Sequence, residues 1–327
     1  MLKLPQVTME RILVTGASGQ IGSELTPKLR DRYGTENVIA SDILEARGPL
    51  VGKGPYELLD VTDKERLERV VREHEINTIF HLAAILSAKG EMKPGLAWEV
   101  NIEGLRNVFE VARELDLVRV FNPSSIAVFG PETPQDLTPQ ETILRPKTVY
   151  GITKVAGELL GDYYFNNHGV DVRGVRFPGV ISNVTPPGGG TTDYAVEIFY
   201  EAIKSGRYTC FVEERTVLPM IYMPDCLKAA LDLMDADLSR LKHHTDFNVA
   251  GVSFSAGELA SEIQKHIPDF EVSYAPDYRQ QIADTWPRSV DDSAAREEWG
   301  WEPEYGLESM VSDMLACLRA RHEAGDL

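Results

Sequence analysis

Cysteine is scarce in this chain of 327 residues, and its scarcity excludes several classes of protein. The three cysteines, Cys210, Cys226 and Cys317, are too few for a disulfide framework. None of them belongs to a Cys-x-x-Cys pair, the spacing typical of zinc-binding and thiol redox sites. We therefore expect no metal site, and a reducing compartment.

Long hydrophobic runs are also missing. No apolar stretch approaches the roughly 18 residues needed to cross a bilayer. Residues 1–10 lack the apolar core of a secretory signal. These observations predict that no segment enters a membrane and that the protein is cytoplasmic.

Basic residues are outnumbered by acidic ones. The 33 Lys and Arg residues against 51 Asp and Glu residues give a formal net charge of −18. Such a field repels phosphate backbones and anionic lipid surfaces, so neither nucleic acid nor a membrane is an expected partner. The remaining composition, 43% hydrophobic and 26% charged, is that of an ordinary globular protein. The length suggests about two domains.

The first half of the chain alternates short β-branched runs with longer amphipathic segments. We expect strands at 11–15, 37–41, 78–82, 118–121 and 172–177, and helices at 20–33, 64–74, 95–115 and 150–168. Strands joined by crossover helices build a parallel sheet with helices on both faces. The predicted fold class is therefore α/β, with a doubly wound parallel sheet.

The pattern changes after Gly179, because a cluster of prolines and glycines at 186–190 interrupts regular structure. We place a domain boundary there, between residues 1–179 and residues 180–327. The second part is expected to be a smaller α/β domain that mainly binds substrate, although some of its segments could return to the sheet. Its predicted helices lie at 192–204, 224–235, 257–265 and 307–321, and its short strands at 208–212 and 270–274.

A glycine loop follows the first predicted strand and opens the first predicted helix. In that context, backbone N–H groups can reach the pyrophosphate of a dinucleotide. We expect this contact from Gly16, Gly19, Gln20, Ile21 and Gly22; a tight βα turn is the structural alternative. The G-x-x-G-x-x-G spacing differs from the G-x-G-x-x-G of ordinary two-domain dehydrogenases.

Two acidic positions follow the next predicted strands. Asp42 stands twenty residues after Gly22, where a carboxylate can accept hydrogen bonds from the adenosine ribose and repel a 2′-phosphate. The sequence thus favours NAD over NADP, unless Asp42 is only a turn residue. Asp60 and Val61 come where a further strand, between those at 37–41 and 78–82, should end, and we expect them to contact the adenine.

A tyrosine and a lysine, Tyr150 and Lys154, are spaced to share one face of a helix. A tyrosine near pKa 10 is a poor base unless a neighbouring cation stabilises its phenolate. Upstream, Ser124 and Ser125 end a predicted strand, at the sheet edge where ligands bind. One of these hydroxyls can orient a substrate alcohol, although serine at such a place often only caps a loop.

Taken together, these motifs resemble the extended short-chain dehydrogenases/reductases, a family with a Rossmann fold. The resemblance implies that Tyr150 is the catalytic base, that Lys154 holds the nicotinamide ribose and lowers the tyrosine pKa, and that Ser125 binds the substrate oxygen. It places Leu82, Ala83, Ala84, Asn101, Ser124, Tyr150, Lys154 and Phe177 against the cofactor. For His81 we favour a packed strand histidine.

Several unusual stretches of the second half narrow the resemblance. Residues 188–199, 210–212, 218–223 and 284–287 look like the L-threonine 3-dehydrogenases of this superfamily. Sugar-nucleotide epimerases and dehydratases are the alternative, but they normally carry Arg-Tyr-Phe-Asn where this chain has Arg-Phe-Pro-Gly at 176–179. A non-catalytic NAD(H) sensor is a weaker alternative, because Ser125, Tyr150 and Lys154 are all present.

The resemblance implies oxidation of the L-threonine β-hydroxyl by NAD, which gives 2-amino-3-oxobutyrate. Besides Ser125 and Tyr150, the candidates for binding L-threonine are Ser87, Thr191, Thr192 and Trp286. Each of the first three could equally be a loop or cap residue, and Trp286 could belong to the core. The family also implies a homodimer that packs through the helices at 95–115 and 150–168.

Overall fold

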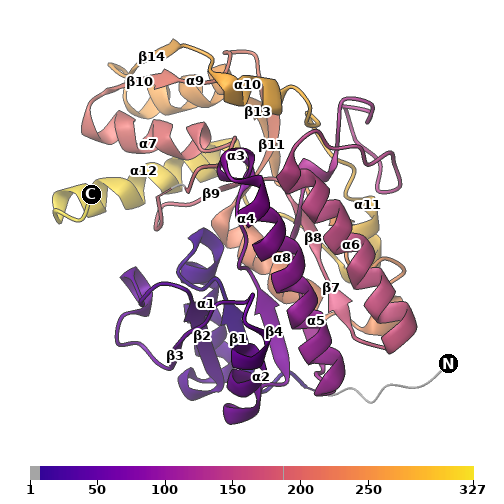
Figure 1. Cartoon of the computed structure of the whole chain (residues 1–327). Helices are drawn as coiled ribbons and strands as arrows, with labels where there is room; N and C mark the ends of the chain where they lie inside the picture. Colours follow the sequence, from indigo (N-terminus) through magenta and orange to yellow (C-terminus); the bar gives the residue numbers. More distant parts are fainter. Residues whose placement is uncertain (1–7, 187) are drawn as a thin grey trace.

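The computed structural model describes residues 8–186 and 188–327 (Figure 1). Its large sheet has six parallel strands in the order β3-β2-β1-β4-β5-β7. The bounds are β1 (Ile12–Thr15), β2 (Val38–Asp42), β3 (Tyr56–Leu58), β4 (Thr78–His81), β5 (Arg119–Phe121) and β7 (Val172–Arg173). Because the strand order reverses between β1 and β4, the predicted doubly wound sheet is confirmed.

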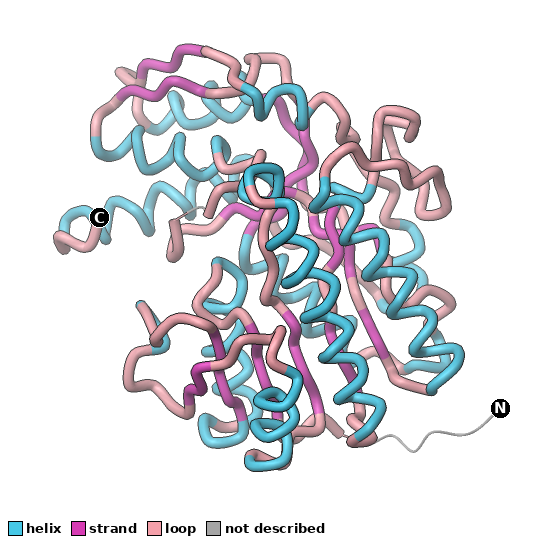
Figure 2. Tube along the Cα trace, viewed as in Figure 1, coloured by secondary structure: helices cyan, strands magenta, loops and turns pink. Residues whose placement is uncertain are grey.

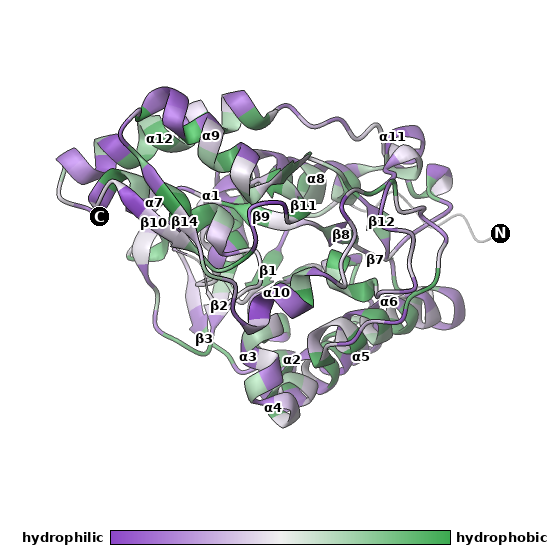
Figure 3. Cartoon of the chain, turned by 90° about the horizontal axis from the view of Figure 1, so that it is seen from above, coloured by the Kyte–Doolittle hydropathy of each residue, from purple (hydrophilic) through white to green (hydrophobic). Residues whose placement is uncertain are grey.

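Helices cover both faces of this sheet. Seen from above, α1 (Gln20–Tyr33) and α8 (Met223–Asp235) lie on one side, and α2 (Lys64–Glu73), α5 (Leu105–Glu114) and α6 (Val149–His168) on the other (Figure 3). The strands have two buried faces: Ile12 and Val14 belong to one hydrophobic cluster and Leu13 to another. This explains the nearly continuous apolar runs of the strand sequences.

The predicted strand at 172–177 is in fact two strands that join different sheets. β7 pairs with β5, whereas β8 (Val175–Phe177) lies between β6 (Ser124–Ser125) and β12 (Phe247–Asn248). The break falls at Gly174, where a Cβ would lie 2.4 Å from the Asn122 carbonyl oxygen and 2.6 Å from that of Thr245. The chain can pass between these carbonyls only as glycine, and periodicity does not reveal such a crowded point.

The predicted helix at 95–115 is helical but not uniformly α-helical. It consists of α4 (Pro94–Trp98), a π-helical segment (Glu99–Gly104) and α5. π-Turns are rare, are frequent at functional sites, and leave no signature in the hydrophobic pattern. The segment contains Asn101, whose contacts are described below.

The second half of the chain builds a smaller layer above the large sheet, and two of its elements, α8 and β12, pack or pair with elements of the first half. The elements not yet given are α3 (Ser87–Met92), β9 (Gly179–Ile181), α7 (Tyr194–Lys204), β10 (Arg207–Cys210), β11 (Val217–Tyr222), β13 (Val252–Ser255), α9 (Ala256–His266), β14 (Glu271–Tyr274), α10 (Tyr278–Ala283), α11 (Ser293–Trp299) and α12 (Leu307–Glu323). β11 pairs with β9 and β13, and β10 pairs with β14. α8 packs on α1, and β12 pairs with β8. Loops lie between the large sheet and this layer (Figure 2).

None of the helices within the described ranges is sufficiently long and apolar to span a membrane.

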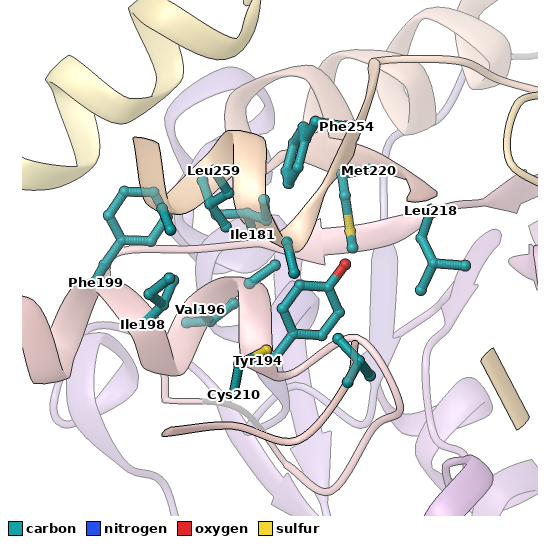
Figure 4. Close-up of a cluster of buried hydrophobic side chains, with 14 of the residues drawn as sticks. Ile181, Tyr194, Val196, Ile198, Phe199, Cys210, Leu218, Met220, Phe254 and Leu259 are labelled. Atoms are coloured by element: carbon teal, nitrogen blue, oxygen red, sulfur yellow. The ribbon is translucent and has the colours of Figure 1, made fainter. Parts of the chain in front are cut away.

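The core of the smaller layer contains an unpaired hydroxyl. Tyr194 is fully buried among Ile181, Leu218, Met220 and Phe254 (Figure 4). Its hydroxyl has no hydrogen-bond partner among the residues the structure describes. A buried unsatisfied hydroxyl typically destabilises the folded state by about 1–3 kcal/mol.

Replacement of Tyr194 by phenylalanine should therefore raise the free energy of unfolding by about 1 kcal/mol. The matched control is Tyr222→Phe, because the Tyr222 hydroxyl is also buried but lies 2.6 Å from both Asn183 Nδ2 and Asp313 Oδ2. That control should destabilise the protein. Denaturant unfolding measures both changes, and a loss of stability in Tyr194→Phe as large as in the control would contradict the prediction.

Candidate functional site

A cavity of about 220 Å³ lies at the carboxyl ends of β1, β4 and β6, below the smaller layer. It is lined by Gly16, Gly19, Gln20, Ile21, Gly22, Leu82, Ala84, Leu86, Ser87, Pro123, Ser124, Ser125, Ile126, Tyr150, Lys154, Phe177, Pro178, Gly179, Val180, Gly190, Thr191, Thr192, Asp193 and Trp286. The structure thus brings together the predicted glycine loop, the Tyr/Lys/Ser set and all four additional substrate candidates. A larger open depression of about 1150 Å³ lies between α7, α9 and the β10–β14 pair. The structure describes every predicted catalytic, cofactor-binding and substrate-binding residue, and none of them lines this depression.

The glycine loop forms a close turn between β1 and α1. Gly16 has φ +68°, and a Cβ there would lie 2.6 Å from the Ala83 backbone nitrogen. A Cβ on Gly22 would lie 2.4 Å from the Gly16 carbonyl oxygen. α1 begins at Gln20 after Gly19, so its first N–H groups have no intrahelical acceptor. This helix N-terminus fits a pyrophosphate, as the sequence predicts.

Asp42 ends β2 beside this loop. Its Oδ2 accepts a hydrogen bond from Ser18 N at 3.1 Å, and its Oδ1 accepts one from Leu44 N at 3.2 Å. The Tyr56 hydroxyl lies 2.9 Å from the Ser18 hydroxyl and donates to the Leu44 carbonyl oxygen. The Asp42 carboxylate is therefore held in a fixed position next to the glycine loop, where it could also accept a hydrogen bond from a ribose hydroxyl.

Asp60 and Val61 follow β3 outside the cavity. The Asp60 carboxylate accepts hydrogen bonds from both the backbone and the hydroxyl of Thr62, at 2.9 and 2.7 Å. Val61 is buried, and its carbonyl oxygen accepts from Asn107 Nδ2 at 3.0 Å. The contact of these two residues with adenine stays a prediction.

The segment after β4 is anchored by Asn101. The Asn101 amide oxygen accepts from Ile85 N at 2.8 Å, and its amide nitrogen donates to Ile85 O and Thr153 Oγ1, both at 3.1 Å. The amide oxygen and nitrogen of Asn101 therefore contact protein groups, and its contact with the cofactor stays a prediction. Ala83 and Asn101 line a much smaller cavity next to Lys154.

His81 lies in the sheet behind this segment. It is buried, and its Nδ1 lies 2.9 Å from Thr15 Oγ1. Burial, assisted by the charge of Lys154, lowers the pKa of His81 to about 3, so the ring is neutral at physiological pH. These contacts agree with a packed strand histidine.

Tyr150 and Lys154 lie one turn apart on α6. The N-cap residue of this helix is Thr148, whose side chain accepts a hydrogen bond from Gly151 N. Lys154 Nζ lies 5.6 Å from the centre of the Tyr150 ring and donates to the Pro123 carbonyl oxygen at 2.6 Å. Burial raises the pKa of Tyr150 to about 12, and a hydrogen bond with the Ser125 side chain opposes this. Burial lowers the pKa of Lys154 to about 8. Lowering of the tyrosine pKa by Lys154 stays a prediction.

The additional substrate candidates come from three distant parts of the chain. Ser87 begins α3, and its hydroxyl lies 3.3 Å from that of Thr191, which precedes α7. Both are buried, as is Trp286, which follows α10. Thr192 completes the set beside Thr191. The arrangement can surround a small polar molecule with hydroxyl groups and one indole.

Among the lining residues with a polar side chain, Asp193 is the one that the sequence analysis did not predict. Asp193 Oδ2 accepts hydrogen bonds from Gly189 N at 2.8 Å and Gly190 N at 2.7 Å, and burial raises its pKa. A carboxylate directly after a run of glycines and threonines could have marked it, because such a group can bind several backbone N–H groups. Asp193 shapes the turn that presents Thr191 and Thr192.

Comparison with known proteins identifies the family. The model of the NAD dependent epimerase/dehydratase family matches residues 12–250. An uncharacterized epimerase/dehydratase of Staphylococcus haemolyticus is 48% identical over 317 residues, which cover 96% of this chain and 99% of that protein. L-threonine dehydrogenase from Clostridium difficile is 52% identical, with a TM-score of 0.94 over 96% of this chain and 99% of that one. A monomeric L-threonine 3-dehydrogenase from a metagenome is 51% identical, with a TM-score of 0.91 over 94% and 99%. The chain therefore belongs to the NAD-dependent epimerase/dehydratase family of extended short-chain dehydrogenases/reductases.

Proposed function

We propose that this protein oxidises the β-hydroxyl of L-threonine with NAD and releases 2-amino-3-oxobutyrate. The supporting observation is that one cavity is lined by the glycine loop, by Ser125, Tyr150 and Lys154, and by the hydroxyl groups of Ser87, Thr191 and Thr192. The similarity to L-threonine dehydrogenases over nearly the whole chain supports the same substrate.

The chain's own groups supply the acid–base chemistry. In this mechanism, Tyr150 removes the proton of the β-hydroxyl, Ser125 donates a hydrogen bond to the same oxygen, and the Lys154 ammonium stabilises the phenolate. The hydroxyls of Ser87 and Thr191 and the indole N–H of Trp286 can bind the substrate carboxylate without an arginine. The glycine loop and Asp42 would hold NAD, which would supply the hydride acceptor for oxidation at Cβ.

The deciding experiment is the increase of NADH absorbance when purified protein is mixed with NAD and L-threonine. L-allo-threonine and a panel of UDP-sugars run in parallel. Formation of NADH from L-threonine supports the proposal. Conversion of a UDP-sugar without oxidation of L-threonine would overturn it in favour of an epimerase, and tight NADH binding without any turnover would favour a sensor.

The choice of NAD over NADP is assigned to Asp42. Asp42→Asn removes the charge that repels a 2′-phosphate but keeps an acceptor for Ser18 N, so the NADP/NAD ratio of kcat/KM should rise about tenfold. Glu36→Gln is the control, because it changes the net charge equally at the exposed amino end of β2. An equal ratio in wild type and Asp42→Asn would contradict the assignment.

We further propose that two copies pair through the helices at 95–115 and 150–168. Exposed apolar side chains gather there: Trp98 on α4 is 48% exposed, and Ile152 and Leu159 on α6 are 45% and 64% exposed. α4 and α6 pack on one another, and exposed apolar side chains on neighbouring helices favour association. Sedimentation equilibrium tests the pairing, and a mass of one chain at every concentration would refute it.

A further inference from the structure

A buried carboxylate lies one helical turn beyond the catalytic lysine. Glu158 follows Lys154 at i+4 on α6, on the same face as Tyr150, and only 4% of its surface is exposed. Nothing in the mechanism above uses this residue. A charged side chain is rarely so deeply buried unless it is fully paired, so its partners are informative.

The partners of Glu158 stand directly beside residues of the cavity. Its Oε1 accepts a hydrogen bond from the hydroxyl of Ser124, the neighbour of Ser125. Both of its oxygens accept from the Arg176 guanidinium at 2.9 Å, and Arg176 precedes Phe177. Since β6 and β8 pair in register through these residues, one carboxylate ties together the two strands that carry Ser125 and Phe177.

The ion pair is itself enclosed. Arg176 also donates to the Gln140 carbonyl oxygen at 3.0 Å and to Asn248 Oδ1 at 3.3 Å, and it lies 3.2 Å from Asp246 Oδ2. Burial raises the pKa of Glu158, and the bidentate contact with Arg176 opposes this shift. A bidentate pair of this kind favours the carboxylate form and fixes its geometry.

The titratable groups around Lys154 lie on α6 and β4. Glu158 on α6 raises the lysine pKa against the effect of burial. His81 on β4 is neutral at physiological pH because its pKa is lowered to about 3. Tyr150 on α6 is the third group, and the centre of its ring lies 5.6 Å from Lys154 Nζ. Among these groups, Glu158 is the one that supplies a negative charge next to Lys154.

We propose that Glu158 is a positioning residue that sets, through its charge, the pH at which Lys154 loses its proton. It also holds Ser125 in place through the hydroxyl of Ser124. Glu158 acts only through these residues and touches neither substrate nor cofactor. The activity readout of this inference rests on the proposed function, but its first test does not.

The first test is competitive acetylation of Lys154 by acetic anhydride as a function of pH, read by mass spectrometry of its peptide. Glu158→Gln keeps an acceptor for Ser124 but removes the charge, so the pH of half-labelling should fall by about one unit. Asp162→Asn, one turn further along α6, is the control and should not move it. An unchanged midpoint in Glu158→Gln would overturn the proposal. The measurement needs neither L-threonine nor turnover.

The second test is the pH profile of kcat/KM with L-threonine and NAD. In wild type, kcat/KM should fall above about pH 8, because the neutral Lys154 amine no longer stabilises the phenolate. In Glu158→Gln this fall should move to lower pH, and Glu158→Asp, which keeps the charge, should restore it. A purely structural role would lower kcat at every pH without moving the midpoint.

A variant with an unpaired Arg176 could fail to fold. The double variant Glu158→Gln/Arg176→Gln removes both charges of the ion pair and keeps hydrogen-bonding groups at both positions. Glu158 is the charge that raises the pKa of Lys154. The double variant should therefore also show a fall in the labelling midpoint, and no fall would count against the proposal.

Discussion

Replacement of Tyr150 by phenylalanine should lower kcat/KM for L-threonine oxidation by about 10²- to 10⁴-fold, the usual effect of removing a general base. The side chain lines the cavity together with that of Ser125, which lowers the Tyr150 pKa against the effect of burial. Phenylalanine keeps the ring against Lys154, so folding and NADH binding should change little. The rate of NADH formation and the fluorescence of bound NADH measure the two effects separately.

Tyr163→Phe is the matched control for this variant. Tyr163 lies on the same helix, but its side chain is 51% exposed and points away from the cavity-lining set. The control should keep wild-type activity. If Tyr150→Phe oxidises L-threonine at the wild-type rate, then another group is the base and the mechanism fails.

Replacement of Gly16 by alanine should abolish most of the NADH affinity and destabilise the protein by about 2–4 kcal/mol. The new methyl would lie within 2.8 Å of three backbone atoms of the Leu82–Ala83 segment, none of which can rotate away. Overpacking of this kind typically contributes about 1–3 kcal/mol. The left-handed φ of +68° adds about 1 kcal/mol. NADH titration and denaturant unfolding measure the two losses.

Gly169→Ala separates the close approach from the backbone strain. Gly169 ends α6 with φ +71°, nearly the value of Gly16, and a Cβ there would meet nothing within 4 Å among the described residues. The control should lose about 1 kcal/mol of stability and no NADH affinity. Equal losses in the two variants would show that strain alone, and not the cradle for the dinucleotide, explains the Gly16 effect.

The strand and helix pattern of the first half was predictable because it is local. Parallel strands buried on both faces produce continuous apolar runs, and crossover helices produce amphipathic ones. The prediction was wrong at Gly174, where one run becomes two strands of different sheets. That break depends on two carbonyls from other parts of the chain, Asn122 and Thr245. Local periodicity carries no information about such a contact.

The sequence by itself determined the groups that act over short spacings: the glycine loop, the pair Tyr150 and Lys154, and Asp42 at a strand end. Their geometry follows from helix pitch and from the alignment of parallel strands. Only the tertiary structure decided that Ser87 meets Thr191, that Trp286 faces the same cavity, and that Glu158 pairs with Arg176. These contacts join segments far apart in the chain, and only the packing of the two layers sets which of them meet.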